Sequence, residues 1–303
     1  MTISRVVETA KRGVWLAYHR NRLIRVSLSP MVLARRAFFG NARQHQLKVI
    51  DHLGRILSDA PQVRLPHFRG TFFVEARSDM FKRVALGDSY EEALAGVVER
   101  GVDTNKDAID VGANCGFYTV LLARMLPGRK VISVEPTDGA LKLLRRNIEL
   151  NCVEGNVTVF QGVATDKEGS ANLNVIEGRE EYSTLGGIVH PSVILAEATS
   201  RSIRVAATTV DHLVISTGIS CGFIKIDVEG HECAVLKGAR ETLLNHRPLV
   251  LAELADPLLR SNGSSALEVI HFMKDLNYNV VDPGDPAITP GKKAYGDILC
   301  IPQ

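Results

Sequence analysis

The stretch Ala108-Ile-Asp-Val-Gly-Ala-Asn-Cys-Gly-Phe-Tyr-Thr119 predicts a buried strand that runs through a glycine loop into a helix. Gly112 and Gly116 leave room where a ligand must approach the backbone, and the start of the helix points free N–H groups at that ligand. Glu135 ends the next apolar run, where its carboxylate can accept hydrogen bonds from two ribose hydroxyls. Because the loop and the acid occur together, we expect a nucleotide site rather than an ordinary strand–turn–helix.

The glycine loop, residues 112–116, also indicates the kind of nucleotide. It lacks the middle glycine of the G-x-G-x-x-G pattern that holds the pyrophosphate of a dinucleotide. A compact adenosyl ligand such as S-adenosyl-L-methionine is therefore favoured over a nicotinamide cofactor. A branched side chain at Gly112 is expected to fill the space that the ligand needs, without unfolding the protein.

Apolar runs and helical segments alternate from Asp107 onward, which predicts an α/β fold with a doubly wound, mostly parallel seven-stranded sheet. The expected strands are 107–111, 130–134, 156–161, 222–226, 248–253, 278–281 and 297–301, and the expected helices are 116–126, 137–150, 232–244 and 264–276. Ligands bind such sheets at the carboxyl ends of the strands. Gly112, Glu135, Asp227 and Glu253 all fall at those ends.

Two regions lie outside this alternation. Residues 1–84 are expected to form an N-terminal extension, helical over 1–60 and followed by a hairpin of 72–76 with 80–84, before a catalytic domain over 85–303. Residues 1–48 carry ten Lys or Arg and one acid. This basic segment is either a peripheral membrane contact or a solvated helical face, and base rates favour the solvated face. The polar segment 177–200, between extra strands at 171–176 and 202–208, is expected to shape a pocket.

Composition excludes several classes of protein. The 303 residues are 45% hydrophobic and 23% charged, with a net charge of +2 that gives no reason to expect a nucleic-acid partner. No apolar run approaches the ~18 residues that span a bilayer. The five cysteines are odd in number and never spaced C-x-x-C, which argues against disulfides and zinc. We therefore expect a reducing, cytoplasmic location.

A second group of polar residues follows the apolar run 223–226. Asp227, Glu229, His231 and Glu232 occur within six residues, and carboxylates crowded at a strand end raise one another's pKa values. Asp227 is the strongest candidate for a functional role, because a carboxylate that closes an apolar strand is costly without a partner. Glu232 is equally well explained as an acid that complements a helix dipole, and His231 as an exposed turn residue.

These blocks together resemble the FkbM-type methyltransferases. The resemblance is carried by residues 109–119, by Glu135-Pro136, by Asn147, by Lys225-Ile-Asp-Val-Glu-Gly-His-Glu232 and by Leu236-Lys-Gly-Ala239, and it covers roughly residues 85–303. It implies the class I methyltransferase (Rossmann-like) fold, S-adenosyl-L-methionine as cofactor, and methylation of a hydroxyl on a sugar, glycan or natural product.

The resemblance also implies roles for single residues. Asp110, Gly112, Asn114 and Gly116 would line the methionine end of the cofactor, Glu135 would hold the ribose, and the backbone at Ala164 would lie near the adenine. Asp227 would face the cofactor amino group or the acceptor. The base for the acceptor hydroxyl is left open among Glu229, His231 and Glu253.

We expect no metal, because no neighbouring Asn or Asp completes an evident cage around the crowded carboxylates. A nucleic-acid methyltransferase is the main alternative, but the strand-end sequence Asp227-Val-Glu-Gly230 lacks the Pro-Pro-aromatic turn of enzymes that methylate base amines. A non-catalytic protein that binds an adenosyl ligand is the other alternative.

Overall fold

The computed structural model describes residues 49, 50, 52, 59–176, 182–185, 200–285 and 295–303. The chain divides into two compact units, one of residues 1–66 and 70–92 and the other of residues 67–69 and 93–303. The domain boundary expected after residue 84 stays a prediction. The helices expected over 1–60 and the basic segment 1–48 lie almost entirely outside the described residues. Within the described part of the chain, no helix is long and apolar enough to cross a bilayer.

The first unit contains a hairpin and a helix. Strand β1 (Gln62–Leu65) pairs antiparallel with β2 (Gly70–Phe73). Helix α4 (Asp79–Ala85) begins after Ser78, whose hydroxyl accepts a hydrogen bond of 3.1 Å from the backbone N–H of Phe81. The hairpin expected between 72–76 and 80–84 is therefore wrong, because the Ser78 cap starts a helix where the second strand was expected.

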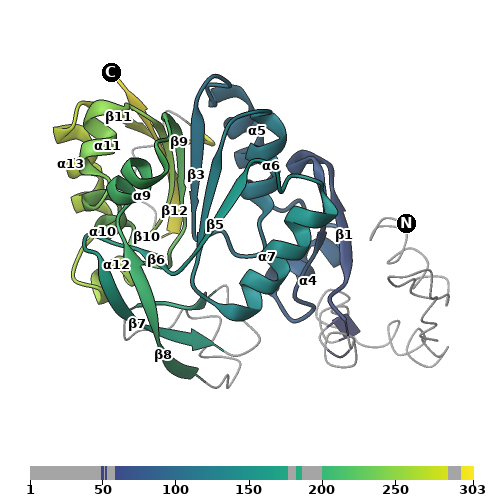
Figure 1. Cartoon of the computed structure of the whole chain (residues 1–303). Helices are drawn as coiled ribbons and strands as arrows, with labels where there is room; N and C mark the ends of the chain where they lie inside the picture. The colour runs from purple at the N-terminus through teal and green to yellow at the C-terminus, as the bar shows by residue number, and fades with distance from the viewer. Residues whose placement is uncertain (1–48, 51, 53–58, 177–181, 186–199, 286–294) are drawn as a thin grey trace, which may run out of the picture. The chain divides into compact units, whose positions relative to one another are not determined.

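The second unit is built on a seven-stranded sheet, which confirms the expected fold class (Figure 1). The strands run in the order β11-β12-β10-β9-β3-β4-β5. Their bounds are β3 (Asp107–Val111), β4 (Val131–Glu135), β5 (Val157–Gln161), β9 (Cys221–Ile226), β10 (Leu249–Ala255), β11 (Tyr278–Val281) and β12 (Tyr295–Pro302). Strands β5, β4, β3, β9 and β10 are parallel, whereas β12 is antiparallel to both of its neighbours.

Helices cover both faces of this sheet (Figure 1). One face carries α5 (Glu92–Gly101), α6 (Phe117–Met125) and α7 (Asp138–Leu150). The other carries α9 (Val210–Thr217), α10 (Glu232–Lys237), α11 (Arg240–Asn245) and α13 (Ala266–Asp275). A further short helix, α12 (Asp256–Ser261), follows β10. A large buried core lies between the second group of helices and the sheet, and includes Ile224, Ile226, Leu236, Val250 and Ile270.

The helix expected over 232–244 is two helices, α10 and α11, with Gly238 between them. A Cβ at Gly238 would lie 2.0 Å from the carbonyl oxygen of Thr165, so only glycine fits at this contact. Helices α9 and α12 are absent from the sequence-based expectation. Both are short, with eight and six residues, and each follows closely on a strand.

A small second sheet follows β5. Strand β8 (Ser200–Thr208) lies between β6 (Val163–Ala164), which is parallel to it, and β7 (Gly169–Ile176), which is antiparallel to it. The two extra strands expected at 171–176 and 202–208 are thus confirmed. Most of the segment between β7 and β8 lies outside the described residues, apart from 182–185.

The ends of β3 and β9 meet at one very close contact. The backbone N–H of Asp227 donates to the carbonyl of Val111 at 3.0 Å, which continues the parallel pairing one residue beyond β9. Gly112 has φ of +79°, and a Cβ there would lie 1.8 Å from the carbonyl oxygen of Asp227. Gly112 is therefore required by the neighbouring strand end, and the expectation that a branched side chain there leaves the protein folded is not supported.

We predict that Gly112→Ala lowers the free energy of unfolding by about 2–5 kcal/mol, the sum of a left-handed backbone and an overpacked contact. Gly128→Ala is the matched control, because Gly128 has φ of +78° but no atom within 4 Å of its added Cβ. The control should lose only about 1–2 kcal/mol. Urea unfolding of both variants measures the difference, and equal losses would show that the contact with Asp227 is not tight.

Candidate cofactor and catalytic site

Asp110 lies in the interior of the sheet, just before the glycine loop, and is 1% exposed. Its Oδ2 accepts a hydrogen bond of 2.6 Å from the Thr119 hydroxyl, which is also 2.8 Å from the Ser133 hydroxyl. Its Oδ1 is buried and has no hydrogen-bond partner among the described residues. Burial raises the pKa of Asp110, although Lys225 and the Thr119 hydroxyl oppose the shift. A buried carboxylate oxygen without a partner is costly, and it suits a ligand that brings a donor.

Glu135 organises the glycine loop from the neighbouring strand end. Its Oε2 accepts a hydrogen bond of 2.9 Å from the backbone N–H of Asn114. Its Oε1 accepts two more from Thr137, at 2.9 Å from the N–H and 2.7 Å from the hydroxyl. The side chain is 6% exposed, so the carboxylate is fixed before any ligand arrives. The contact of this carboxylate with a ribose stays a prediction.

Two more contacts hold the loop. The buried side chain of Asn147 donates a hydrogen bond of 2.8 Å from Nδ2 to the carbonyl of Cys115. Gly116 has φ of +92°, and a Cβ there would lie 2.5 Å from Cδ1 of Leu144. The expected helix start at Gly116 is confirmed, since α6 begins at Phe117 with Gly116 as its N-cap. Both glycines of the loop are thus explained by backbone geometry and packing, and their contact with a cofactor stays a prediction.

Ala164 lies in β6 and is 2% exposed. The next residue, Thr165, donates its backbone N–H to the carbonyl of Thr208 at 2.8 Å. This connection sets the course of the chain after β5. The role of the Ala164 backbone beside an adenine stays a prediction.

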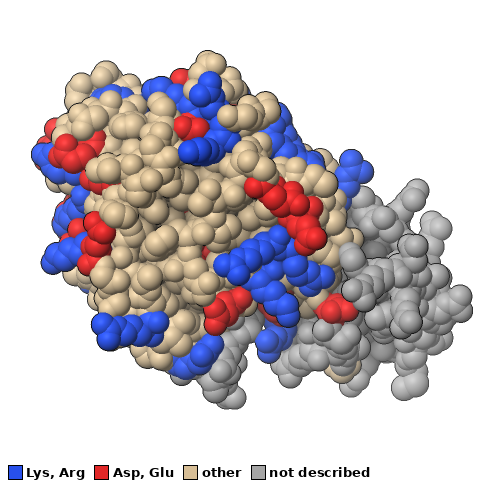
Figure 2. All heavy atoms as spheres, viewed as in Figure 1, with Lys and Arg blue, Asp and Glu red and all other residues tan. Residues whose placement is uncertain are grey.

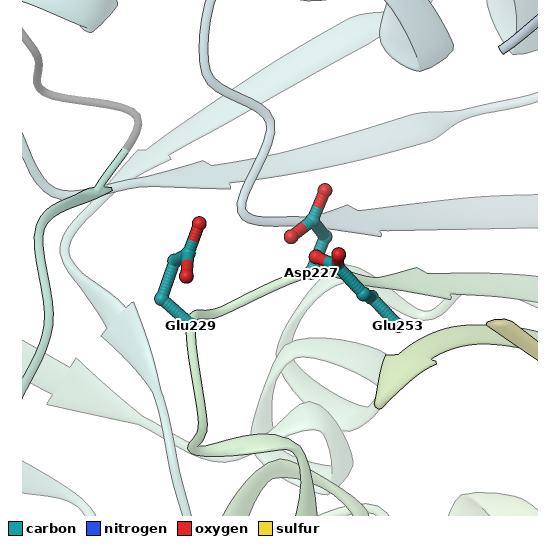
Figure 3. Close-up of side chains that lie close together, drawn as sticks. All are labelled: Asp227, Glu229 and Glu253. Carbon is teal, nitrogen blue, oxygen red and sulfur yellow. The ribbon is translucent and has the colours of Figure 1, made fainter. Parts of the chain in front are cut away.

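The acidic residues expected at the strand ends do converge. Carboxylate oxygens of Asp227, Glu229 and Glu253 lie within 4.8 Å of one another (Figure 3). Asp227 follows β9 directly and Glu253 lies in β10, the parallel neighbour of β9. Glu229 comes from the loop after β9 and has φ of +50°, which is unusual for a residue with a side chain.

A buried lysine accompanies this acidic cluster. Lys225 in β9 is 6% exposed, and its Nζ lies 2.7 Å from Oδ2 of Asp227. The same Nζ lies 4.9 Å from the centre of the Tyr118 ring. Burial alone would raise the pKa of Asp227, but Lys225 and a hydrogen bond with Glu253 outweigh it and lower that pKa. Asp227 is therefore held as a carboxylate, and its side chain is still 32% exposed.

Glu253 titrates in the opposite direction. The charge of Asp227 is the main cause that raises the pKa of Glu253 well above its usual value, followed by burial. Glu229 and Asp297 add to the same effect. The opposite pKa shifts of Asp227 and Glu253 could not be predicted from the sequence, because they depend on β10 lying beside β9 and on β12 lying beside β10.

Glu232 and His231 have mainly structural surroundings. Oε1 of Glu232 accepts hydrogen bonds from the backbone N–H groups of Val228 at 3.2 Å and Gly230 at 3.1 Å, which closes the loop after β9. Burial raises the pKa of Glu232 to about 7. Burial lowers the pKa of His231 to about 4, and its Nδ1 lies 3.2 Å from the Asn262 amide. His231 is thus a neutral, partly buried residue rather than an exposed turn histidine.

Lys225, Tyr118 and Thr137 are the site residues that sequence reasoning missed. Lys225 and Tyr118 belong to the quoted motifs, but nothing in the one-dimensional pattern shows that Lys225 reaches both Tyr118 and Asp227. A charged residue inside an otherwise apolar run is the one available signal. Tyr118 is also covered by the ring of Phe68, with centroids 5.1 Å apart.

We predict that Glu232 makes stability depend on pH. Its pKa in an unfolded chain is near 4.5 and in the folded protein about 7, so the unfolded chain loses this proton first as pH rises. The free energy of unfolding should fall between these pH values, by up to about 3 kcal/mol for this group, since one pKa unit corresponds to about 1.4 kcal/mol.

Glu232→Gln should remove that fall, whereas Glu149→Gln on the exposed side of α7 should not. Urea unfolding from pH 4.5 to 7.5 measures the slopes. Parallel curves for the wild type and Glu232→Gln would contradict the assignment.

Comparisons with known proteins cover most of the second unit. The model of the methyltransferase FkbM domain matches residues 110–280, which is more than half of the chain. A release factor glutamine methyltransferase of Geobacter sulfurreducens is 30% identical over 115 residues, 38% of each chain. A methyltransferase FkbM structure from Methylobacillus flagellatus shows a TM-score of 0.42 and 20% identity, covering 64% of this chain and 43% of that one. A putative O-methyltransferase from Klebsiella pneumoniae shows a TM-score of 0.37 and 14% identity, covering 89% and 94%.

The chain thus spans well under two thirds of the length of the first two of these relatives. The match to the methyltransferase FkbM domain includes the glycine loop, Glu135, the acidic cluster and Lys225. With this match and the class I arrangement of its sheet, the chain belongs to the FkbM methyltransferase family.

Proposed function

We propose that the protein is an S-adenosyl-L-methionine-dependent O-methyltransferase that acts on a hydroxyl of a sugar, glycan or natural product. The observation that carries this proposal is that the glycine loop after β3 lies beside the acidic cluster at the ends of β9 and β10. The preformed loop of β3 with Glu135 suits an adenosyl ligand, and the acidic cluster beside it suits a reacting hydroxyl.

The sheet supports a methyl donor over a nicotinamide cofactor. Dinucleotide-binding sheets have the strand order 3-2-1-4-5-6. Here β5-β4-β3-β9-β10 match the first five positions, but the antiparallel strand β12 separates β10 from β11. The missing middle glycine of the loop points the same way.

The residues present fit the cofactor. Asp110 offers a buried oxygen without a partner to the methionine end, beside the loop of Gly112, Asn114 and Gly116. Glu135, whose carboxylate is fixed by the loop, would hold the ribose, and the chain at Ala164 would border the adenine. When bound, the cofactor would supply a methyl group already activated on a sulfonium.

The protein then has to orient the acceptor, exclude water and remove a proton. Asp227 is ionised and partly exposed, so it can accept a hydrogen bond from an acceptor hydroxyl. The cluster carries carboxylates and therefore favours an acceptor that is neutral at its reacting end. His231, with its lowered pKa and its contact to Asn262, is a weaker candidate for the base than the strand-end acids.

A nucleic-acid acceptor has less support. Figure 2 shows basic side chains gathered over α7, where Lys142, Arg145 and Arg146 lie, but acidic side chains flank them and most of this face is uncharged. Such a face lacks the continuous basic surface that binds a phosphate backbone. A contact between the basic segment 1–48 and a membrane surface stays a proposal with no described residue to support it.

We predict that S-adenosylhomocysteine raises the melting temperature and NAD does not. At ~100 times its dissociation constant, the ligand should add about 2.7 kcal/mol to the free energy of unfolding. Differential scanning fluorimetry with both ligands at millimolar concentration measures this. A shift with NAD and none with S-adenosylhomocysteine would overturn the cofactor assignment.

The acceptor class needs a second measurement. Mass spectrometry of glycans and small metabolites from cells with and without the protein should find a species 14 Da lighter when the protein is missing, because each transfer replaces hydrogen by a methyl group. A methylated nucleoside in RNA or DNA as the sole difference would reject the hydroxyl acceptor and leave the cofactor assignment standing.

We also predict that Glu135→Ala weakens S-adenosylhomocysteine binding by about 1.5–3 kcal/mol, the range for hydrogen bonds to a charged group. Thr137→Val is the matched control, since it removes the hydroxyl contact to Glu135 and keeps the carboxylate. The control should cost under about 1 kcal/mol. Isothermal titration calorimetry on both folded variants decides, and wild-type affinity in Glu135→Ala would remove Glu135 from the binding site.

A further inference from the structure

Lys225 is a buried cation beside the acidic cluster, and no role has been assigned to it so far. It lies in the central strand β9, pairs in register with Asp110 of β3, and is 6% exposed. Lysine is almost never fully buried unless it is paired, because removing an ammonium from water is costly. Its contacts include the carboxylate of Asp227 at 2.7 Å and the face of the Tyr118 ring, whose centre lies 4.9 Å away. Residues 225 and 227 share one side of the chain because successive side chains of a strand alternate.

The carboxyl group of Asp227 in turn lies beside that of Glu253 from the adjacent strand, with oxygens of the two within 4.8 Å of each other. Two carboxyl groups this close to each other disfavour double ionisation, so the pair keeps a proton to higher pH than an isolated carboxyl group does. The ammonium of Lys225 makes the two carboxyl groups unequal, because its 2.7 Å contact is with Asp227 and favours the negative charge there. On the other side, Glu253 faces Glu229 and the β12 residue Asp297, which both disfavour a charge on it.

We propose that Lys225 is a positioning residue, which holds Asp227 as the carboxylate and places the proton of the pair on Glu253. Other acids near the pair, among the residues that the structure describes, are Asp110 on β3 and Glu232 on α10. Burial raises the pKa values of both acids; Lys225 partly opposes the shift at Asp110, but its 2.7 Å contact is with Asp227. The lowered pKa of Asp227 and the raised pKa of Glu253 agree with this arrangement.

For methyl transfer the inference rests on the proposed function, and it assigns the base to Asp227. The acceptor O–H bond breaks and its electron pair forms the new O–C bond. The pair of the broken S–C bond stays on sulfur, and the proton goes to the carboxylate of Asp227. Glu253, already protonated, donates to Asp227 and cannot take the proton itself.

The test is a carboxyl titration of the protein without ligand. Protein labelled with ¹³C at the Asp and Glu carboxyl carbons is titrated by NMR, with Asp227→Asn, Glu253→Gln and Glu232→Gln for assignment. We expect one resonance to titrate well above the usual range for glutamate and to be lost in Glu253→Gln, whereas Asp227 stays ionised down to acidic pH. A raised pKa for Asp227 itself would overturn the proposal. This titration does not depend on a lysine variant that folds.

Lys225→Met provides the second arm. It should raise the pKa of Asp227 and move the proton toward it, whereas Lys237→Met should change neither carboxyl. Lys237 is the matched control, because it also pairs with a glutamate, Glu268 at 2.9 Å, but is 47% exposed. An unchanged Asp227 titration in folded Lys225→Met would overturn the proposal. So would a Mg²⁺ titration that moves the Asp227, Glu229 and Glu253 resonances together at micromolar metal, which would make the cluster a cation site.

A third arm follows once an acceptor is known. Lys225→Met should lower kcat by about 10²–10⁴-fold and move the acidic limb of the rate profile to higher pH, with S-adenosylhomocysteine affinity little changed. An equal loss without movement of the limb would indicate a structural role and contradict the proposal. The titrations use unliganded protein, so they can succeed even if S-adenosylhomocysteine fails to bind, and the two failures are distinguishable.

Discussion

The carbonyl oxygen of Asp227 occupies the place where a side chain at residue 112 would lie, and the rest of the site depends on this approach. The N–H of Asp227 is bonded to Val111, so the ends of β3 and β9 cannot shift independently. The glycine loop belongs to one strand and the acidic cluster to the other. A single backbone contact therefore sets the distance between the glycine loop and the acidic cluster.

The charges of the cluster are better explained by function than by stability. Buried ion pairs lose solvation on folding, and apolar residues of the same volume often serve a core as well or better. Yet Lys225, Asp227, Asp110 and Glu253 lie together at the ends of strands whose other inward residues are apolar. Groups with shifted pKa values that gather at one edge of a sheet are typical of active sites.

Sequence reasoning reached the fold because its strands are apolar runs between glycines and polar turns. It failed where local signals competed, as at Ser78, where the cap of α4 outweighed an apolar pattern that also suits a strand. It failed again at Gly238, whose need for glycine comes from the distant Thr165 carbonyl. In the site, sequence reasoning identified the acids but not that the pKa of one is lowered and the pKa of another is raised. That difference arises because the strand order β3-β9-β10 brings Lys225, Asp227 and Glu253 together.

The acids after β9 also divide into two kinds. Glu232 points its Oε1 back at the N–H groups of Val228 and Gly230 and so builds the loop. Glu229 has a left-handed backbone, and its carbonyl accepts a hydrogen bond of 3.1 Å from the Thr184 hydroxyl. Thr184 lies in the short described piece of the segment between β7 and β8, which therefore reaches the loop that carries the acidic cluster. A change in that segment can thus reach the acidic cluster through Glu229, whose charge also contributes to the raised pKa of Glu253.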